Sequence, residues 1–438
     1  MKFINNNYLK KQTIRNYGSF LFLIGIFFIP STLFIGALFL LPAAIIGSNL
    51  NDKPYLKDKW NYPFIVFGLL ILMSSFLQNF VFINNYDSIW NPILSIAGMG
   101  NWLPFIWFFW AFQPYINSES KRKTFAKTLI AGTFPVLITG FGQYFFDWTG
   151  PFETLNGLII WYQRPVENPG GLTGLFNNQN YTGSWLNIIW PFCLALFLEK
   201  RKDFFRKTIS FGFLFSVGYA AFLTFSRNAW IGLLTSTPIM LEKKRLKQLV
   251  PFISIVIFIS FFLISSIFKG ELQNYLRDLF PEKILLEFSD EGYKDLDATR
   301  LEIFSSAFNL IKTSPIFGIG AGSFSAIYFM ETTFWKGHSH NLLLELGISY
   351  GLPSSIIFFT AITFILYLSG KSLFLKRNIN NIFLFDKAFW SASLFFLISQ
   401  LFDIQYLDGK ISIIIWILIS GLKNIIEENN KSIVSYNK

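Results

Sequence analysis

Long apolar runs separated by short polar segments dominate the sequence, and they constrain the fold more than any other feature. An α-helix needs about 20 apolar residues to cross a bilayer. The runs cover residues 19–47, 63–83, 98–116, 125–146, 181–198, 207–225, 228–241, 249–268, 346–369, 388–404 and 410–424. A hydrophobic content of 52% and a charged content of 14% exclude an ordinary soluble protein. We therefore predict an all-α polytopic membrane protein.

The first run, 19–47, is too long for one crossing. Around Pro30 and Ser31 it could form a tight turn between two short helices, or it could be one long kinked helix. The tight turn places every basic cluster on one side of the membrane, as the positive-inside rule requires. These clusters contain Lys10, Lys11 and Arg15; Lys53, Lys57 and Lys59; Lys121, Arg122, Lys123 and Lys127; Lys200, Arg201, Lys202, Arg206 and Lys207; Lys243, Lys244, Arg245 and Lys247; Lys371, Lys376 and Arg377; and Lys423. We therefore predict a single integral membrane domain, 1–438, of about twelve transmembrane helices with both termini cytoplasmic.

One segment, 269–345, is much longer than the other connections and lies between the ninth and tenth predicted helices. Counting crossings places it on the extracytoplasmic side. Apolar residues recur at helical spacing over 301–311. Asp297 or Thr299 could cap the start of this helix, and Pro315 ends it. We expect the helix to lie along the membrane surface.

The net charge of +11 does not indicate nucleic-acid binding, because the cations stand between apolar runs and not on one soluble face. Cys193 is the only cysteine, so neither an intramolecular disulfide nor a cluster of thiolate metal ligands can form. Walker A, Rossmann and serine-hydrolase motifs are absent from the sequence, which disfavours nucleotide-driven transport.

The two histidines of the chain, His338 and His340, stand together at the end of the large loop. Imidazole has an ordinary pKa of about 6.5, which suits a general base near neutral pH. The alternative is a pair of loop histidines bonded to the backbone. A zinc site is disfavoured because no third ligand stands at a convincing spacing, although Glu345 could help.

Two arginines are candidates for binding a phosphate or diphosphate. Arg227 lies between two apolar runs on the predicted outer face, where a guanidinium could bind two oxygens at once or could simply extend to the membrane surface. Arg300 begins the loop helix, where a cation faces the positive end of the helix dipole. A bound anion would relieve that conflict, and so would pairing with Asp297 or Glu302.

The predicted outer loop around Arg164 and 170–180 is rich in glycine and amide side chains. Asn178 and Asn180 could bind sugar hydroxyls, although ordinary turn formation explains them as well. Asp295 and Asp297 lie in an acidic part of the large loop, and we interpret them as solvated.

Several of these segments resemble the O-antigen ligase and O-antigen polymerase family of bacterial inner-membrane proteins. Residues 174–180 are similar to the outer loop of the family, and 224–230 to its Ser-Arg segment. Residues 300–324 resemble the start of its large periplasmic loop. The spacing from His340-Asn341 to Gly351 is the best match. The likeness covers mainly 170–355.

This resemblance implies transfer of a glycan from an undecaprenyl-diphosphate carrier to an acceptor hydroxyl, inverting and without metal or cofactor. His340 would activate the acceptor, and Arg227 and Arg300 would hold the diphosphate. Residues that could bind the glycan or orient the site are Arg164, Asn178, Asn180, His338 and Asn341. The acceptor could be a glycan or lipid A-core, since ligases and polymerases share these motifs.

A second function class is a membrane transporter, because some relatives of this family have been linked to inorganic carbon uptake. A transporter should carry broken helices and buried charges near the membrane midplane. The candidate residues instead map to the predicted outer interface, so we favour the glycosyltransferase.

Overall fold

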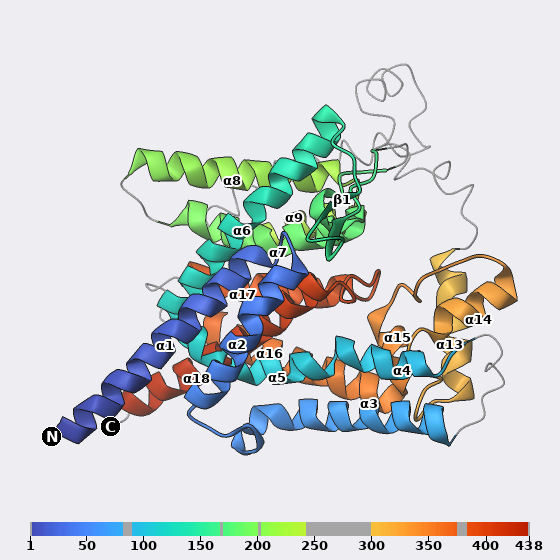
Figure 1. Ribbon diagram of the computed structural model, residues 1–438, viewed down its shortest axis with the longest axis horizontal. Helices are drawn as coiled ribbons and strands as arrows, with labels where there is room; N and C mark the ends of the chain where they lie inside the picture. Colours follow the sequence, from blue (N-terminus) through green and yellow to red (C-terminus); the bar gives the residue numbers. More distant parts are fainter. Residues whose placement is uncertain are drawn as a thin grey trace. The chain divides into compact units, whose positions relative to one another are not determined.

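The computed structural model describes residues 2–81, 90–166, 170–199, 203–241, 299–374 and 383–436 (Figure 1). The predicted span 249–268 and the first part of the large loop, 269–298, lie outside these ranges. Seven helical segments in the described ranges are long and apolar enough to cross a membrane: Leu33–Leu50, Lys59–Phe80, Ile93–Ala111, Glu119–Phe146, Gln179–Leu198, Leu352–Phe374 and Gly409–Lys431. The chain is therefore a helical, multi-pass membrane protein, and a total of twelve spans stays a prediction.

The chain divides into two compact units, residues 1–135 with 298–438 and residues 136–297. Helix α6 (Glu119–Phe146) runs through the boundary. The first unit also contains α1 (Lys2–Phe28), α2 (Leu33–Leu50), η1 (Tyr55–Lys57), η2 (Lys59–Asn61), α3 (Tyr62–Phe80), α4 (Ile93–Gly98), η3 (Met99–Asn101), α5 (Leu103–Ala111), η4 (Gln113–Tyr115), α13 (Arg300–Thr313), α14 (Ser323–Thr332), α15 (Leu342–Tyr350), α16 (Leu352–Phe374), α17 (Leu384–Ser399) and α18 (Gly409–Tyr436).

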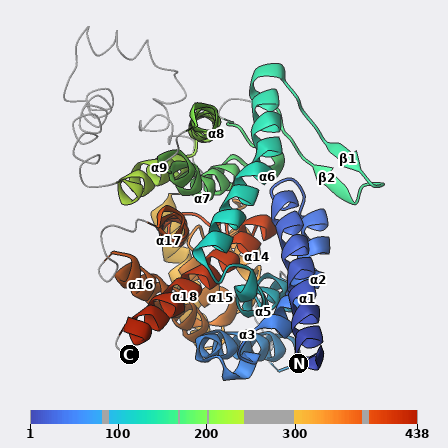
Figure 2. The same ribbon diagram turned by 90° about the vertical axis from the view of Figure 1, so that its left-hand side faces the viewer.

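The first apolar run forms two helices, as the basic clusters predicted. The backbone turns over residues 29–32, where Pro30 cannot donate a helical hydrogen bond, and α1 and α2 pack side by side (Figure 2). Small residues allow the close approach: a Cβ added at Gly25 would lie 2.6 Å from Leu40, and one at Gly36 would lie 2.5 Å from Ile29. One long kinked helix is therefore excluded.

The run 98–116, predicted as one helix, is interrupted. It divides into the end of α4, the short helix η3, α5 and η4, and Pro104 stands in the first turn of α5. Proline has no backbone N–H to continue an existing helix but fits the first turn of a new one. The prediction of a continuous helix was wrong here because it weighed hydrophobicity alone.

Helix α18 is the centre of the first unit. Its apolar stretch is 89% buried, the highest fraction among the seven candidate spans. Isoleucines occupy several faces of its first half, and a helix that is apolar all round is stable only when neighbours cover it. Helices α5, α16 and α17 pack against it.

Two cations assigned to the basic clusters are buried in ion pairs. The Arg122 Nε lies 2.6 Å from Asp386 Oδ1, and its Nη2 lies 3.0 Å from Asp386 Oδ2 and 2.7 Å from Glu428 Oε2. Lys423 lies 3.2 Å from Asp58 and 2.9 Å from Glu427. Arg122 therefore ties α6 to α17 and α18, a structural role that the charge pattern did not predict.

The Asp386→Asn variant should unfold more easily than the wild type by about 3–5 kcal/mol, because Arg122 would keep a buried charge with one carboxylate fewer. The free energy of unfolding in mixed micelles measures this difference. The matched control is Arg206→Ala, which breaks an exposed pair with Asp203 and should cost under about 1 kcal/mol. Equal effects of the two variants would contradict a structural role for the buried pair.

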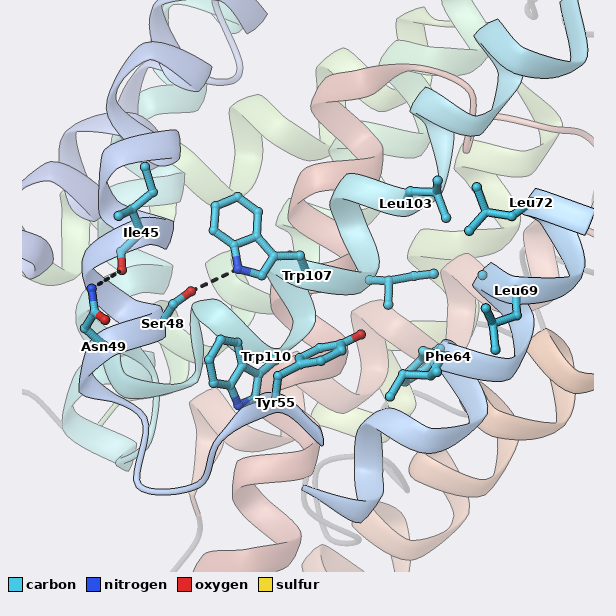
Figure 3. A pocket seen from close by; sticks show the side chains of 13 residues that line it. Ile45, Ser48, Asn49, Tyr55, Phe64, Leu69, Leu72, Leu103, Trp107 and Trp110 are labelled. Atoms are coloured by element: carbon cyan, nitrogen blue, oxygen red, sulfur yellow. Dashed lines mark hydrogen bonds between the residues drawn. The ribbon is translucent and has the colours of Figure 1, made fainter. Parts of the chain in front are cut away.

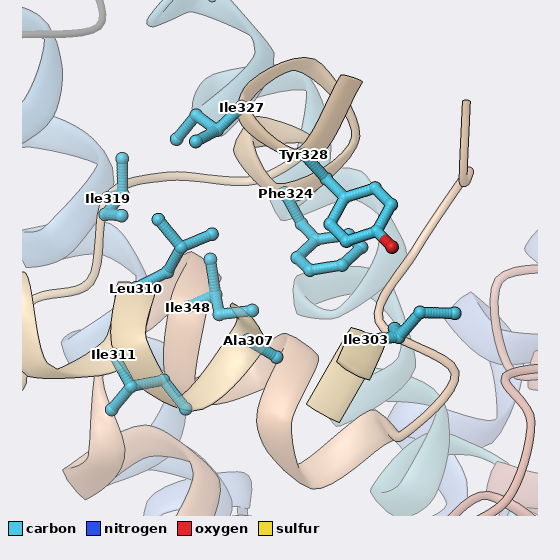
Figure 4. Close-up of a cluster of buried hydrophobic side chains, with 9 residues drawn as sticks. All are labelled: Ile303, Ala307, Leu310, Ile311, Ile319, Phe324, Ile327, Tyr328 and Ile348. Carbon is cyan, nitrogen blue, oxygen red and sulfur yellow. The ribbon is translucent and has the colours of Figure 1, made fainter. Parts of the chain in front are cut away.

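The described end of the large loop has a hydrophobic core of its own (Figure 4). Helices α13, α14 and α15 and the loop between α13 and α14 supply it, and α13 shows the helical spacing that the sequence predicted. The core consists of Ile303, Ala307, Leu310, Ile311, Ile319, Phe324, Ile327, Tyr328 and Ile348. Because this core fixes α13 against α15, it also fixes the residues that begin each of these helices.

The sequence predicted one helix over 346–369, but the structure has two, α15 and α16, which meet at Gly351. This residue has a φ of +86°, and a Cβ there would lie 2.0 Å from the Ile316 carbonyl oxygen. Only glycine tolerates both conditions without strain. The next residue, Leu352, donates its N–H to the Pro315 carbonyl at 2.8 Å. Gly351 is therefore the break between two helices and does not lie inside one.

The second unit contains the end of α6, η5 (Gly174–Phe176), α7 (Gln179–Leu198), α8 (Phe204–Leu223) and α9 (Arg227–Met240). It also contains two strands, β1 (Phe152–Thr154) and β2 (Ile159–Trp161), which pair antiparallel. The predicted helical membrane fold is confirmed, with this small hairpin added to it. The hairpin stands in a connection that shows no apolar periodicity, where four residues in turn conformation join two very short strands.

Candidate functional site

Arg300 occupies the first position of α13, and the helix begins with a capping box. The Thr299 hydroxyl accepts the Glu302 N–H at 3.3 Å, and the Glu302 carboxylate accepts the Thr299 N–H at 2.7 Å. Of the two residues proposed as caps, Thr299 is the one that serves. Arg300 donates from Nη1 to the carbonyl of Phe402, a residue about a hundred positions further along the chain. This bond turns the guanidinium toward the segment after α17.

The side chain of Asn341 stabilises the turn from His338 to Asn341. Its side-chain oxygen accepts the N–H groups of Leu343 and Leu344 at 3.0 and 3.1 Å, and so caps α15. Its Nδ2 donates to the Leu401 carbonyl at 3.0 Å. Asn341 therefore attaches the start of α15 to the same segment that Arg300 contacts. Both polar atoms of its side-chain amide make these structural hydrogen bonds.

Residues 400–406, which follow α17, form a rigid turn around Gln400. The Gln400 side-chain oxygen accepts the N–H groups of Gln405 and Tyr406 at 3.0 Å each. The Gln400 backbone carbonyl accepts the Leu342 N–H at 2.8 Å. This turn holds Asp403, which the Ile404 N–H also bonds at 3.1 Å.

His340 and Asp403 form a hydrogen-bonded pair at the centre of these elements. Nδ1 of His340 lies 2.8 Å from Oδ1 of Asp403. With Asp403 ionised, a neutral His340 carries its proton on Nδ1, and Nε2 is then the basic nitrogen. The His340 side chain is 25% exposed and that of Asp403 is 12% exposed, so the imidazole is the more accessible partner. This is the geometry of a general base oriented by a carboxylate.

The charges around Asp403 favour its ionised form. Burial alone would raise the pKa of this carboxyl, but the hydrogen bond from His340 and the charges of His338, His340 and Arg300 hold the pKa below its ordinary value. Asp403 is thus an anion at neutral pH, surrounded by the three cationic or basic groups that the sequence singled out in this part of the chain.

His338 lies against His340 with ring centroids 4.6 Å apart. Its Nδ1 accepts the backbone N–H of His340 at 3.2 Å, which leaves the proton of the neutral ring on Nε2. The pKa of His338 is lowered to about 4, mainly by burial. The charge of Asp403 acts to raise this pKa, whereas the charges of His340 and Arg300 lower it. His338 is therefore a neutral hydrogen-bond donor at physiological pH.

The lowered pKa of His338 makes the folded state sensitive to acid. Between pH 6.5 and about 4 the unfolded chain binds a proton that the folded chain does not, so stability decreases as the pH falls. The shift corresponds to at most about 3 kcal/mol. In the His338→Asn variant, whose side-chain oxygen can replace Nδ1, the free energy of unfolding should depend less on pH over this range. An unchanged dependence would contradict a buried neutral His338.

Residues 211–359, about a third of the chain, match the family model described as O-antigen ligase. The match includes Arg227, Arg300, His338 and His340. This part of the chain is therefore similar to the O-antigen ligase family. A comparison with curated proteins gives no match. The match supports a membrane enzyme of glycan assembly, of the O-antigen ligase or polymerase type.

The structure places the O-antigen ligase candidate residues in both units. Arg300, His338, His340 and Asn341 come together in the first unit, as described above. Arg227 is the first residue of α9 in the second unit and is half-buried. Convergence of Arg227 with His340 stays a prediction.

The other three candidates also belong to the second unit. Arg164 is exposed, and its backbone carbonyl accepts a hydrogen bond from Gln143 at 2.6 Å. The Asn178 side chain caps α7 by accepting the Asn180 N–H at 2.7 Å. Asn178 thus has the turn-forming role that the sequence offered as an alternative to sugar binding.

The sequence-based argument against a metal site was wrong in one respect. It held that the histidines lack a third ligand, but Asp403 supplies one, and ligand atoms of His338, His340 and Asp403 all lie within 4.8 Å of one another. Glu345, the residue considered for this role, instead accepts the Ser339 N–H at 2.9 Å. The same three side chains could therefore hold a cation or act as base and orienting groups, and a chelator distinguishes the two.

Asp403 is the important residue that sequence reasoning missed. It lies 63 positions from His340 and outside the matched residues. A signal was present, because an ionisable residue inside the apolar run 388–404 is a functional candidate by default. The prediction treated that run only as a span and did not ask what the acid would pair with.

Proposed function

We propose that this protein transfers a glycan from an undecaprenyl-diphosphate carrier to an acceptor hydroxyl, with inversion and without a metal. The observation that carries the proposal is the 2.8 Å bond between His340 Nδ1 and Asp403, because it leaves Nε2 of His340 as a base for the acceptor. The family match supports glycan chemistry in general.

The proposed reaction is a single displacement. His340 Nε2 takes the proton of the acceptor hydroxyl while the acceptor oxygen attacks the anomeric carbon of the donor glycan. The bond from that carbon to the diphosphate oxygen breaks, and its electron pair leaves with undecaprenyl diphosphate. Asp403 stabilises the imidazolium that forms. The proton leaves His340 for solvent after the product has departed.

Negative charge grows on the diphosphate as the bond breaks, and a fixed cation at that place lowers the barrier. In this proposal Arg300 supplies such a cation in the first unit, together with the N–H groups at the start of α13. Arg227, which also begins a helix, supplies the second one. His338 donates from Nε2 to an oxygen of the glycan or the carrier and orients it, beside a turn that Asn341 holds in place.

The proposal places the protein in the bacterial inner membrane, with both termini cytoplasmic and the loop 269–345 periplasmic. This orientation follows from the basic clusters, and it puts the site where lipid-linked glycans are exposed after translocation. The acceptor is a growing glycan for a polymerase and lipid A-core for a ligase.

Deletion of the gene tests the function. We expect a lipopolysaccharide gel of the deletion strain to lack long O-chains, and a plasmid copy of the wild type to restore them. Cores carrying a single repeat unit would identify a polymerase, and accumulated lipid-linked polymer would identify a ligase. Unchanged surface glycan in the deletion strain, together with solute uptake by the purified protein in liposomes, would replace this proposal with the transporter.

A further inference from the structure

A wide apolar groove opens on the first unit, away from the histidines. It has a volume of about 660 Å³ and runs between α2, α3 and α5 (Figure 3). Its walls include Ile45 of α2, Leu69 and Leu72 of α3, and Leu103 of α5. Leu69 and Leu72 are 59% and 43% exposed. In a membrane protein such a groove faces acyl chains and not water, and its volume is within the usual range of about 300–1,000 Å³ for a ligand pocket.

One end of the groove is polar and aromatic. Trp107 donates from its indole nitrogen to the Ser48 hydroxyl at 2.9 Å, and Trp110 donates to the Lys53 carbonyl at 3.1 Å. Both indoles are thus satisfied by the protein. Tryptophans whose N–H is hydrogen-bonded and whose ring face is apolar are typical of the membrane–water interface. The groove therefore has a defined direction, from an interfacial end to an apolar end.

Tyr55 gives this interfacial end a hydrogen-bond donor. Its ring packs edge-on against Trp110 with centroids 5.4 Å apart, and its hydroxyl points into the groove (Figure 3). Within the described part of the chain that hydroxyl has no hydrogen-bond partner. A donor at the polar end of a mostly apolar groove favours an occupant that carries an oxygen at this depth and a hydrocarbon chain beyond it.

The connection after α2, whose Lys53 carbonyl meets Trp110 of the groove, carries positive charge. Lys53 has 59% of its side-chain surface exposed, and the carboxylate it contacts within the described residues is Glu427, at the long distance of 3.7 Å. Lys57 and Lys59 follow in the same short connection and are exposed. The Asp58 carboxylate between them is buried and forms an ion pair with Lys423. The connection therefore presents net positive charge to the membrane surface, which attracts anionic headgroups.

We propose that this groove is a binding site for an anionic glycerophospholipid. One acyl chain lies along Leu69, Leu72 and Leu103, an ester or phosphate oxygen accepts the Tyr55 hydroxyl proton, and the headgroup phosphate lies near Lys53. The isoprenoid tail of a glycan donor is the competing occupant. The position of the groove on α3 disfavours the isoprenoid tail. The groove uses the first half of α3, from Phe64 to Leu72. The second half is the one that meets the large loop, because Ser74 and Gln78 donate to the connection between α13 and α14.

Native mass spectrometry of the purified full-length protein tests this site with three probes: palmitoyl-oleoyl phosphatidylglycerol, the matching phosphatidylcholine, and undecaprenyl phosphate. We expect one phosphatidylglycerol to be retained at least tenfold more tightly than phosphatidylcholine. Equal retention of the two phospholipids, or preferential retention of undecaprenyl phosphate, would overturn the proposal.

Two variants locate the binding. Leu72→Trp fills the groove from a membrane-exposed position and should weaken phosphatidylglycerol retention about tenfold, while the control Leu38→Trp, 58% exposed on α2 outside the groove, should not change it. Tyr55→Phe removes one hydroxyl and should weaken retention about fivefold even if Leu72→Trp fails to fold. Wild-type retention in Tyr55→Phe and in a folded Leu72→Trp would show that the lipid binds elsewhere.

Discussion

The His340→Gln variant is expected to lose glycan transfer by about 10²–10⁴-fold, the usual loss when a general base is removed. Glutamine can keep a hydrogen bond to Asp403 but cannot accept the acceptor proton at neutral pH. The measurement is the initial rate of transfer from a synthetic lipid-linked donor by purified protein. We expect kcat to fall much more than KM rises, because the lost interaction acts on the transition state.

Two controls accompany this variant. Glu331→Gln changes an exposed residue of α14 outside the site and should keep wild-type activity. A chelator should leave the wild-type rate unchanged if His338, His340 and Asp403 act as a base and its orienting groups. Full activity of His340→Gln would contradict the proposed base, and loss of activity with EDTA that added zinc restores would reassign these side chains to a metal.

The local parts of the site were predictable because they depend on neighbours in sequence. Thr299 and Glu302 stand three residues apart and form the capping box, and His340 is set by the cap that follows it at Asn341. The histidine pair and Arg300 could be selected for the same reason, since a loop residue with special chemistry stands out against an apolar chain.

The partners of these residues could not be predicted, because tertiary contacts supply them. Asp403 reaches His340 only through the turn that Gln400 organises, and no spacing rule connects positions so far apart. The same holds for Arg122, whose basic cluster served only to predict the topology, whereas the structure buries it in bonds to Asp386. The charge pattern describes the average of a whole segment, so it does not reveal a single buried ion pair.

The fold shows the same division. Apolar runs located the helices well, because burial in lipid or protein requires a continuous apolar length. They failed where the backbone must break for packing: at Gly351, which passes close to the Ile316 carbonyl, and before Pro104. A hydrophobicity pattern carries no information on where two chain segments need to approach each other, and the available signs were the glycine and the proline inside these apolar runs.

The Asp403→Asn variant is expected to lower kcat by about 10²–10⁴-fold although Asp403 touches neither substrate in the proposed reaction. A neutral amide can still bond His340, but it can present its N–H to Nδ1, so the ring then carries its proton on Nε2 and cannot accept another at low cost. The affinity for the lipid-linked donor should change little. The initial-rate assay used for His340→Gln measures both quantities.

Rescue by a second acid and the rate per folded molecule separate this orienting role from a structural one. A simple loss of folded protein lowers the rate only in proportion to the folded fraction, whereas the wrong tautomer of His340 lowers kcat of every folded molecule. Asp403→Glu keeps the charge at an altered distance and should recover part of the activity. A kcat reduced only in proportion to the folded fraction in Asp403→Asn would leave Asp403 only the task of holding the turn 400–406. If kcat per folded molecule falls and Asp403→Glu recovers activity, the base is the His340–Asp403 pair and not the histidine alone, and the turn after α17 belongs to the catalytic machinery as much as the large loop does.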